Sequence, residues 1–359
     1  MSKDAEIGPT RPADFAMLFF VAVVLSLGQT CVFIQYHQFN LNSLALATAH
    51  FFRGETHWRT FQNRLLGPAL VLLIQKLLCA AGRREYLTAL RGYYYAATVT
   101  VNVIFLALVL NIRRSLTFGF ICLMGFIGFQ VLMWTEWYYP WDPLELLLFS
   151  TLLLMELKRR RGWTFFYLLF LVWVFTKETA IFVPIWLIVT RGIIPSDWKS
   201  PRAWWGPNAK IVGNSIAMFA IASVITRTLR NRLFVRSVLP NVGADDQDRN
   251  VGQHLQLFNN VHLTRLDILR FIHIHSATYS YGTFYCIMIG CLLSYSAWRL
   301  RQLYVPPALA FRMLLFVAIY FLSVVVAGFA VETRVYLPFG PMALAFYLVV
   351  TGDLETIAV

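Results

Sequence analysis

Four groups of charged residues interrupt otherwise apolar parts of this sequence, and charges in such surroundings commonly serve a function. The first group centres on Glu55, the one acidic residue between Asp14 and Glu85. Glu55 could therefore belong to a functional site, with His57 and Arg59 beside it. It could equally be an exposed carboxylate that pairs with a neighbouring arginine.

The second group lies among five aromatic residues between positions 134 and 141, a pattern typical of a membrane interface. Asp142 precedes Pro143 and could cap a helix that begins there. Glu145 would then lie in the first turn, where the helix dipole favours an acidic residue. Alternatively, Asp142 binds a divalent cation such as Mg²⁺ or Mn²⁺, or orients a polar substrate together with Glu136. Both interpretations stay open on the sequence alone.

The third group is Lys177 with Glu178, midway through an apolar stretch at 163–190. Adjacent residues on a helix point in different directions, so these two side chains neutralise each other only in part. A break in the helix at this point would place both at the outer face of the protein. We therefore expect a broken pair of helices here, with both residues in contact with substrate.

The fourth group, Glu332, Arg334 and Tyr336, separates the last two apolar segments. An arginine at an outward membrane boundary suits a phosphate, because a guanidinium can form two parallel hydrogen bonds to it. The alternative is an internal salt bridge between Glu332 and Arg334. In the first interpretation, Arg334 faces the same cavity as the other groups, and Glu55 lies within about 10 Å of Asp142, because a shared site must join them.

The elements that must position these groups are membrane helices. The chain has 359 residues, of which 58% are hydrophobic and only 14% charged. Apolar segments of about 20 residues recur along it, which is the length that crosses a bilayer. This excludes a disordered protein, a coiled coil and an ordinary cytosolic enzyme. We predict an all-α, polytopic membrane protein with about ten transmembrane helices in a single domain, residues 1–359.

The predicted spans follow the apolar segments and occupy residues 15–36, 92–111, 116–134, 143–157, 163–190 as a broken pair, 211–229, 282–299, 309–329 and 336–351. Two long loops are predicted, at 36–91 and 231–281. A further apolar segment, 65–81, opens with Gly67-Pro68 and carries Lys76. We expect this segment to be re-entrant or to lie flat, as a juxtamembrane helix of the first outer loop.

The formal net charge of +13 reflects membrane topology. The basic residues form short runs between apolar segments, such as Lys158 to Arg161, and cytoplasmic loops carry such runs. This places both long loops outside, and we expect no nucleic-acid partner. The five cysteines all lie in apolar segments and form neither a disulfide framework nor a zinc site.

In its order of features, the chain resembles the GT-C superfamily of membrane glycosyltransferases, such as protein O-mannosyltransferases and aminoarabinose transferases. The residues that carry this resemblance are Glu55, Arg64-Leu65-Leu66-Gly67-Pro68, Arg91, Arg113-Arg114, Trp141-Asp142-Pro143, Lys158 to Arg161 and Thr176-Lys177-Glu178. The late pattern at 332–338 also resembles short bacterial proteins of this kind. The likeness covers most of the chain and is one of order and spacing.

The resemblance implies a GT-C-like fold and transfer of a sugar from a polyprenyl-phosphate donor to an acceptor hydroxyl. By this analogy Glu55 is the base, and Asp142 is the second-loop acid that binds a metal in some relatives. Lys177 or Arg334 would stabilise the lipid-phosphate leaving group. The expected substrate-binding residues are His57, Arg59, Arg64, Glu136, Lys177, Glu178, Glu332, Arg334 and Tyr336.

The resemblance also implies a place and partners for the protein. We expect a multi-pass protein of the bacterial inner membrane whose active site faces outward, among membrane lipids. The chain is short for this class, so acceptor recognition must be simple or must come from a partner subunit.

Two other functions remain open on the sequence. A transporter or lipid flippase would also show broken helices and charges within the membrane, but it would gather them near the midplane. A non-catalytic assembly subunit would keep the fold without the site. Convergence of Glu55, Asp142 and Lys177 at one outer-face cavity would favour an enzyme.

Overall fold

The structure, a computed structural model, describes residues 12–49, 64–80, 86–133, 138–157, 162–192, 201–229, 280–302, 308–327 and 333–343. Every regular element in these ranges is helical, which confirms the all-α class. The helices are α1 (Pro12–Tyr36), α2 (Gln38–Ala49), α3 (Leu66–Ala80), α4 (Tyr86–Ile112), α5 (Leu116–Met133), α6 (Asp142–Leu157), α7 (Trp163–Val174), α8 (Phe182–Leu187), α9 (Pro201–Thr228), α12 (Ser280–Gln302) and α13 (Ala308–Ala327). Three further short helical elements are the 3₁₀ helices η3 (Glu178–Ile181) and η6 (Thr333–Tyr336) and the π-helix η4 (Ile188–Gly192).

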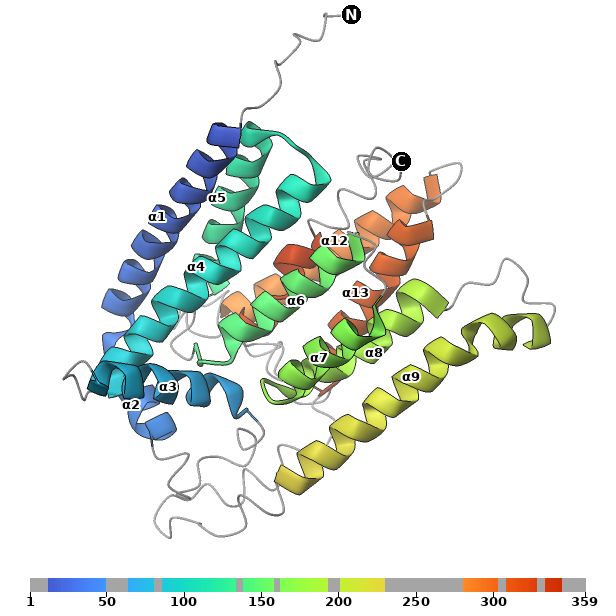
Figure 1. The fold of residues 1–359 in the computed structure, drawn as a ribbon. Helices are drawn as coiled ribbons and strands as arrows, with labels where there is room; N and C mark the ends of the chain where they lie inside the picture. The colour runs from blue at the N-terminus through green and yellow to red at the C-terminus, as the bar shows by residue number, and fades with distance from the viewer. Residues whose placement is uncertain are drawn as a thin grey trace, which may run out of the picture.

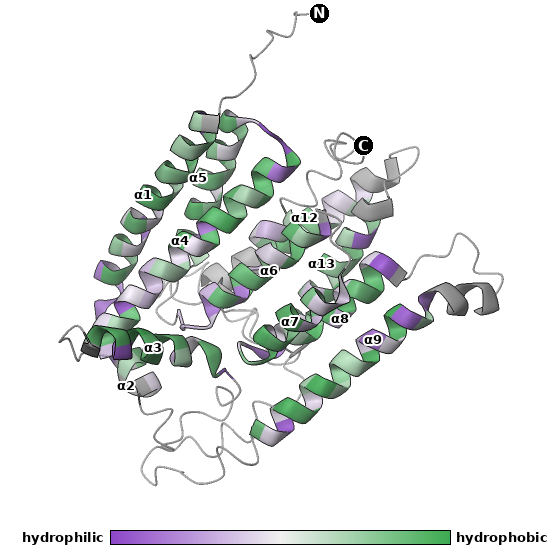
Figure 2. Ribbon diagram, in the orientation of Figure 1, coloured by the Kyte–Doolittle hydropathy of each residue, from purple (hydrophilic) through white to green (hydrophobic). Residues whose placement is uncertain are grey.

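Several of these helices are suited to a membrane. Among the described residues, four are long and apolar enough to cross one: Ala13–Tyr36, Tyr86–Ile112, Leu116–Met133 and Asn208–Thr228. Shorter apolar helices occupy Leu66–Leu78, Trp163–Val174, Ile287–Trp298 and Phe311–Val326. Hydrophobic residues run along the helices in Figure 2. These features support an integral membrane protein.

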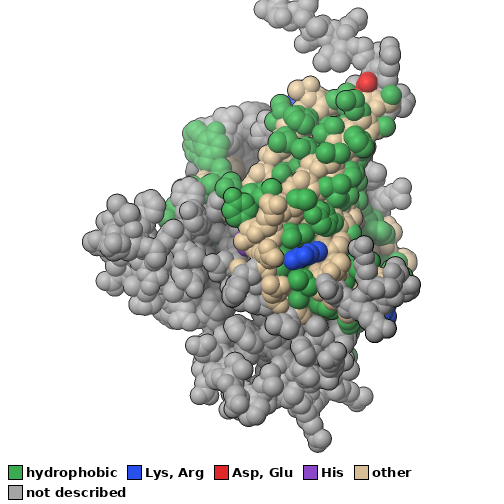
Figure 3. Space-filling view, turned by 90° about the vertical axis from the view of Figure 1, so that its left-hand side faces the viewer, with side chains coloured by type: hydrophobic (Ala, Val, Ile, Leu, Met, Phe, Trp, Pro, Cys, Tyr) green, Lys and Arg blue, Asp and Glu red, His purple; other side chains and the backbone are tan. Residues whose placement is uncertain are grey.

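The surface that α1 lines is covered by hydrophobic side chains with isolated charges among them (Figure 3). Along α1 itself, Met17, Phe20, Val24 and Val32 are exposed. An apolar face of this kind is poorly suited to water and well suited to lipid tails.

Helices α1, α4 and α5 pack along one another, and α6 packs on the other side of α4 (Figure 1). Buried polar side chains join the first three. Asn102 of α4 donates hydrogen bonds to Ser26 Oγ at 2.9 Å and Gln29 Oε1 at 2.8 Å, both on α1. Gln130 of α5 donates to Asn102 Oδ1 at 2.6 Å. Hydrogen bonds of this kind hold helices together where apolar burial provides no driving force, as in lipid.

The predicted break within 163–190 is confirmed. Helix α7 ends at Val174, and Lys177 has an extended backbone before η3 and α8 continue. The break is held by its own contacts, since Trp173 Nε1 donates to Thr179 Oγ1 at 3.1 Å. Pro184 is tolerated in the first turn of α8, because its missing N–H has no helical partner there.

The segment predicted at 65–81 is the helix α3, and it crosses the lower ends of α1 and α4 in Figure 1 instead of running along them. Gly67 allows this close approach, because an added Cβ would lie 2.8 Å from the carbonyl carbon of Pro140. The region predicted as the first loop therefore contains two helices, α2 and α3, of which only α3 was predicted. The second long loop, 231–281, lies outside the described residues except for its last two positions, and the span predicted at 336–351 is described only as far as 343.

Candidate functional site

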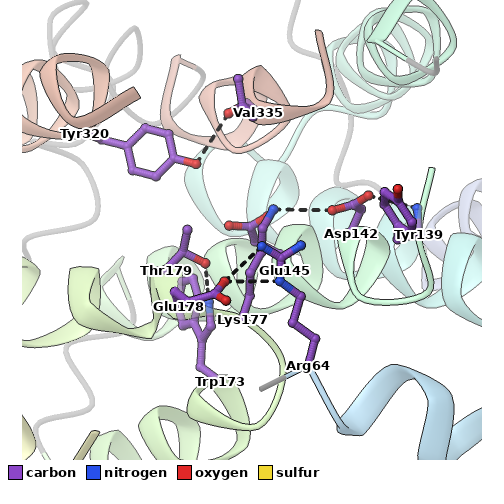
Figure 4. Close-up of polar contacts among 10 residues, drawn as sticks. All are labelled: Arg64, Tyr139, Asp142, Glu145, Trp173, Lys177, Glu178, Thr179, Tyr320 and Val335. Carbon is purple, nitrogen blue, oxygen red and sulfur yellow. Dashed lines mark hydrogen bonds and ion pairs between the residues drawn. The ribbon is translucent and has the colours of Figure 1, made fainter. Parts of the chain in front are cut away.

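Five charged side chains from three distant parts of the chain meet at the ends of helices (Figure 4). Arg64 lies just before α3, and Asp142 and Glu145 occupy the first turn of α6. Lys177 and Glu178 lie at the break between α7 and α8. Within the described parts of the chain, these residues form three ion pairs: two that share the buried Lys177, and a third, between Arg64 and Glu178, beside them.

The buried part of the site is built around Lys177. Its Nζ lies 3.3 Å from Asp142 Oδ1 and 2.5 Å from Glu145 Oε2. Relative exposures are 9% for Lys177, 1% for Asp142 and 2% for Glu145. Buried charges are tolerated when they are paired, so each of the three residues depends on the others for its ionised form.

Asp142 also closes the turn that leads into α6. Its Oδ2 accepts a hydrogen bond from the Tyr139 N–H at 2.9 Å, and its own N–H donates to the Tyr139 carbonyl at 3.0 Å. Both carboxylate oxygens of Asp142 are therefore engaged. Asp142 closes the turn at the start of the helix with one oxygen and binds Lys177 with the other; its contact with a substrate stays a prediction.

Two tyrosines of α4 form hydrogen bonds to the turn that precedes α6. The Tyr94 hydroxyl donates to the Tyr138 carbonyl at 2.6 Å, and the Tyr93 hydroxyl donates to the Pro140 carbonyl. Trp141 is almost completely buried beside them. Because the turn is tied to α4, the start of α6 is fixed relative to the first half of the protein.

Glu145 differs from Asp142 in the use of its oxygens. Oε2 accepts the hydrogen bond from Lys177, whereas Oε1 is buried and has no hydrogen-bond partner among the described residues. The Tyr320 hydroxyl of α13 lies within electrostatic range of both carboxylates and donates to the Val335 carbonyl at 3.3 Å. Glu145 was placed in the first turn by the sequence, but its part in the site was missed. The signal was its spacing from Asp142, since residues three apart share one face of a helix.

Arg64 and Glu178 form the outer pair. Arg64 Nη2 and Nε lie 3.0 and 3.1 Å from Glu178 Oε2, and the guanidinium stands 5.1 Å from the centre of the Trp141 ring. The Glu178 side chain is 38% exposed and that of Arg64 is 13% exposed. Burial raises the pKa of the Glu178 carboxyl, but the charges of Arg64 and Lys177 and hydrogen bonds to it outweigh this and hold the pKa below its usual value.

Two backbone contacts bring Arg64 to the site. The Leu66 N–H donates to the Phe175 carbonyl at 2.9 Å, at the end of α7. Gly67 rests against Pro140 at the start of α6. The beginning of α3 is therefore wedged between the two helix ends that carry Asp142 and Lys177.

Of the residues that the sequence singled out, the structure brings together Arg64, Asp142, Lys177 and Glu178. Five others lie outside the described residues, so the expected proximity of Glu55 and Asp142 stays a prediction: Glu55, His57, Arg59, Glu136 and Glu332.

The late group is described in part. The backbone of Arg334 belongs to η6, but its side chain lies outside the described part of the structure. Tyr336 is fully buried, with its ring centroid 6.0 Å from that of Phe339. The Val335 carbonyl between them accepts the Tyr320 hydrogen bond, which links η6 to the helix beside the ion cluster. Substrate contacts of Arg334 and Tyr336 stay predictions.

A divalent cation does not fit at Asp142 as the side chains lie. Both of its oxygens are engaged, and the Lys177 ammonium occupies the space between its carboxylate and that of Glu145. In the part of the chain that the structure describes, no group of three or more His, Cys, Asp or Glu side chains could hold a metal ion. A Mg²⁺ or Mn²⁺ site would need ligands from other residues.

No protein-family model matches this chain, and no curated protein or solved structure is significantly similar to it. The chemistry of the site is therefore the guide to function. If all five side chains are ionised, three are negative (Asp142, Glu145 and Glu178) and two are positive (Arg64 and Lys177), which leaves a net charge of −1. Carboxylates accept protons and hydrogen bonds from hydroxyls, and the two cations can bind phosphate.

Proposed function

We propose that this protein is a GT-C-like membrane glycosyltransferase, which moves a sugar from a polyprenyl-phosphate donor to an acceptor hydroxyl at the outer membrane face. The observation that carries the proposal is that Arg64, Asp142 and Lys177 lie at one site, where Lys177 binds Asp142 and Glu145 and Arg64 binds Glu178, the residue next to Lys177. These residues come from three separated segments that the resemblance singles out. Acid and base groups combined with phosphate-binding cations are the minimum that this transfer requires.

The position of the cluster favours an enzyme over a transporter or flippase. Asp142 begins α6, Lys177 follows the end of α7 and Arg64 precedes α3, so all three lie at helix ends. Arg64 and Asp142 adjoin loops that we expect on the outside, whereas the sites of secondary transporters lie near the bilayer midplane. The charges that meet here also favour an active protein over a non-catalytic assembly subunit, because buried charges are costly to keep without a function.

In the proposed reaction, Arg64 and Lys177 are the described cations that could take the phosphate of the donor. Each would exchange a carboxylate partner for a phosphate, a change between two charge-assisted contacts of similar kind. Glu55 and Arg334 stay candidates for the base and for a second phosphate contact. The proposed partners are membrane lipid and the polyprenyl-phosphate sugar. A partner subunit would contribute to recognition of the acceptor.

The proposed topology has about ten membrane helices in the bacterial inner membrane, with both long loops and the site outside. Helix α3 would lie flat on the outer surface, which agrees with its course across the ends of α1 and α4 (Figure 1). Cysteine labelling tests this arrangement. An Arg83→Cys variant that reacts only from the cytoplasm would mean that α3 spans the membrane.

The proposed activity is tested in proteoliposomes with a panel of labelled polyprenyl-phosphate sugars, by measuring release of polyprenyl phosphate. We expect turnover by the wild-type protein and a loss of at least about 100-fold in Lys177→Met. Lys76→Met is the matched control, because Lys76 is exposed on α3 away from any ion pair that the structure describes. No turnover of any donor would contradict the proposal, and movement of intact donor across the bilayer would identify a flippase.

A further inference from the structure

The two carboxylates beside Lys177 are not equivalent, and the difference separates their roles. Asp142 has one oxygen on Lys177 and the other on the Tyr139 N–H. Glu145 has Oε2 on Lys177, while Oε1 is buried and finds no hydrogen-bond partner in the part of the chain that the structure describes. Buried polar atoms nearly always have a partner, so an open carboxylate oxygen calls for a ligand that donates a hydrogen.

We propose that Glu145 is the residue that takes the proton of the acceptor hydroxyl, through Oε1, and that Asp142 is a positioning residue that holds Lys177 and the start of α6. This inference rests on the proposed transferase function. It places the proton acceptor on α6, whereas the resemblance alone points to Glu55 in the first loop.

The charge of the cluster supports a proton acceptor here. Two carboxylates share one ammonium, so Asp142, Glu145 and Lys177 together carry one excess negative charge. The outer pair of Arg64 and Glu178 is neutral as a unit and does not offset it. This excess of negative charge favours a ligand that donates a hydrogen, such as a hydroxyl. Among the described residues, the Tyr320 hydroxyl also faces both carboxylates, and the Tyr93 and Tyr94 hydroxyls face Asp142.

The step balances as follows. The acceptor O–H bond breaks and its proton binds Glu145 Oε1, while the hydroxyl oxygen forms a bond to the anomeric carbon of the donor sugar. The bond between that carbon and the phosphate oxygen breaks, and its electron pair leaves with the polyprenyl phosphate. The side chain of Lys177, bound to Glu145, is 11% exposed and would stabilise the negative charge of the departing phosphate.

The test compares three isosteric variants of this chain: Glu145→Gln, Asp142→Asn and Glu55→Gln. Single-turnover rates are measured against pH with the donor that the wild-type protein uses. We expect Glu145→Gln to lose about 10²–10⁴-fold in rate with little change in donor KM, and to lose the rise of rate with pH. Asp142→Asn should raise KM and lower the rate while the rise with pH persists. A Glu145→Gln protein with the wild-type rate and the wild-type dependence of rate on pH overturns the inference. It is also overturned if Glu55→Gln is the one variant that loses the rise of rate with pH.

The outcomes separate this inference from the proposed function. Turnover of a donor at the same rate by both the wild-type protein and Glu145→Gln would refute the inference and keep the transferase. No turnover of any donor by the wild-type protein would refute the transferase, and the inference with it.

Discussion

Replacing Lys177 by methionine should destabilise the protein strongly, because it leaves two buried carboxylates without their cation. At an effective dielectric constant of about 20, the contacts at 3.3 and 2.5 Å correspond to attractions of about 5 and 7 kcal/mol. Desolvation of the three buried groups offsets much of this. Removing one member of a buried ion pair costs about 3–5 kcal/mol in practice, and we expect that loss for Lys177→Met.

The assay is unfolding of the purified protein in detergent, with Lys76→Met as the exposed control. A triple variant, Lys177→Met with Asp142→Asn and Glu145→Gln, provides the sharper comparison. It removes the stranded charges, so it should be more stable than Lys177→Met alone, although it carries two more substitutions. Equal stability of Lys177→Met and the wild-type protein would refute the account of the cluster as a mutually dependent set of charges.

Three further outcomes are expected. Asn102→Leu should lower the free energy of unfolding by about 1–3 kcal/mol, because it leaves its buried hydrogen-bond partners unsatisfied; thermal unfolding in detergent measures this. Gly67→Ala should cost about 1–3 kcal/mol and lower activity, since the added Cβ pushes α3 away from Pro140; a normal unfolding temperature with full activity would contradict this. The pKa of Glu178 is lowered in the folded protein, so its pair with Arg64 contributes stability above about pH 4.5, which is lost as the pH falls through the lower folded value; Arg64→Gln should flatten this acid dependence of unfolding.

The positions of the helices could be predicted from the sequence because an apolar segment of membrane length is a local property. The spans predicted at 92–111 and 116–134 correspond to Tyr86–Ile112 and Leu116–Met133. The break at Lys177 could be predicted for a similar reason, since a charged pair cannot continue an apolar helix without cost. The buried amide of Asn102 was not singled out, because its importance lies in partners on two other helices.

The sequence by itself therefore determined the helical class, the places of most of the described helices, though not of α2, and four of the five charged residues of the site. Only the tertiary structure decided how those charges pair: Lys177 with Asp142 and Glu145, and Arg64 with Glu178. The pairing depends on long-range contacts, such as Leu66 against Phe175, which place three helix ends together. Spacing along a chain carries no information about such contacts, because they depend on how whole helices pack. Glu145 Oε1 is the clearest example, because its lack of a hydrogen-bond partner among the described residues can be recognised only after the surrounding helices have been packed.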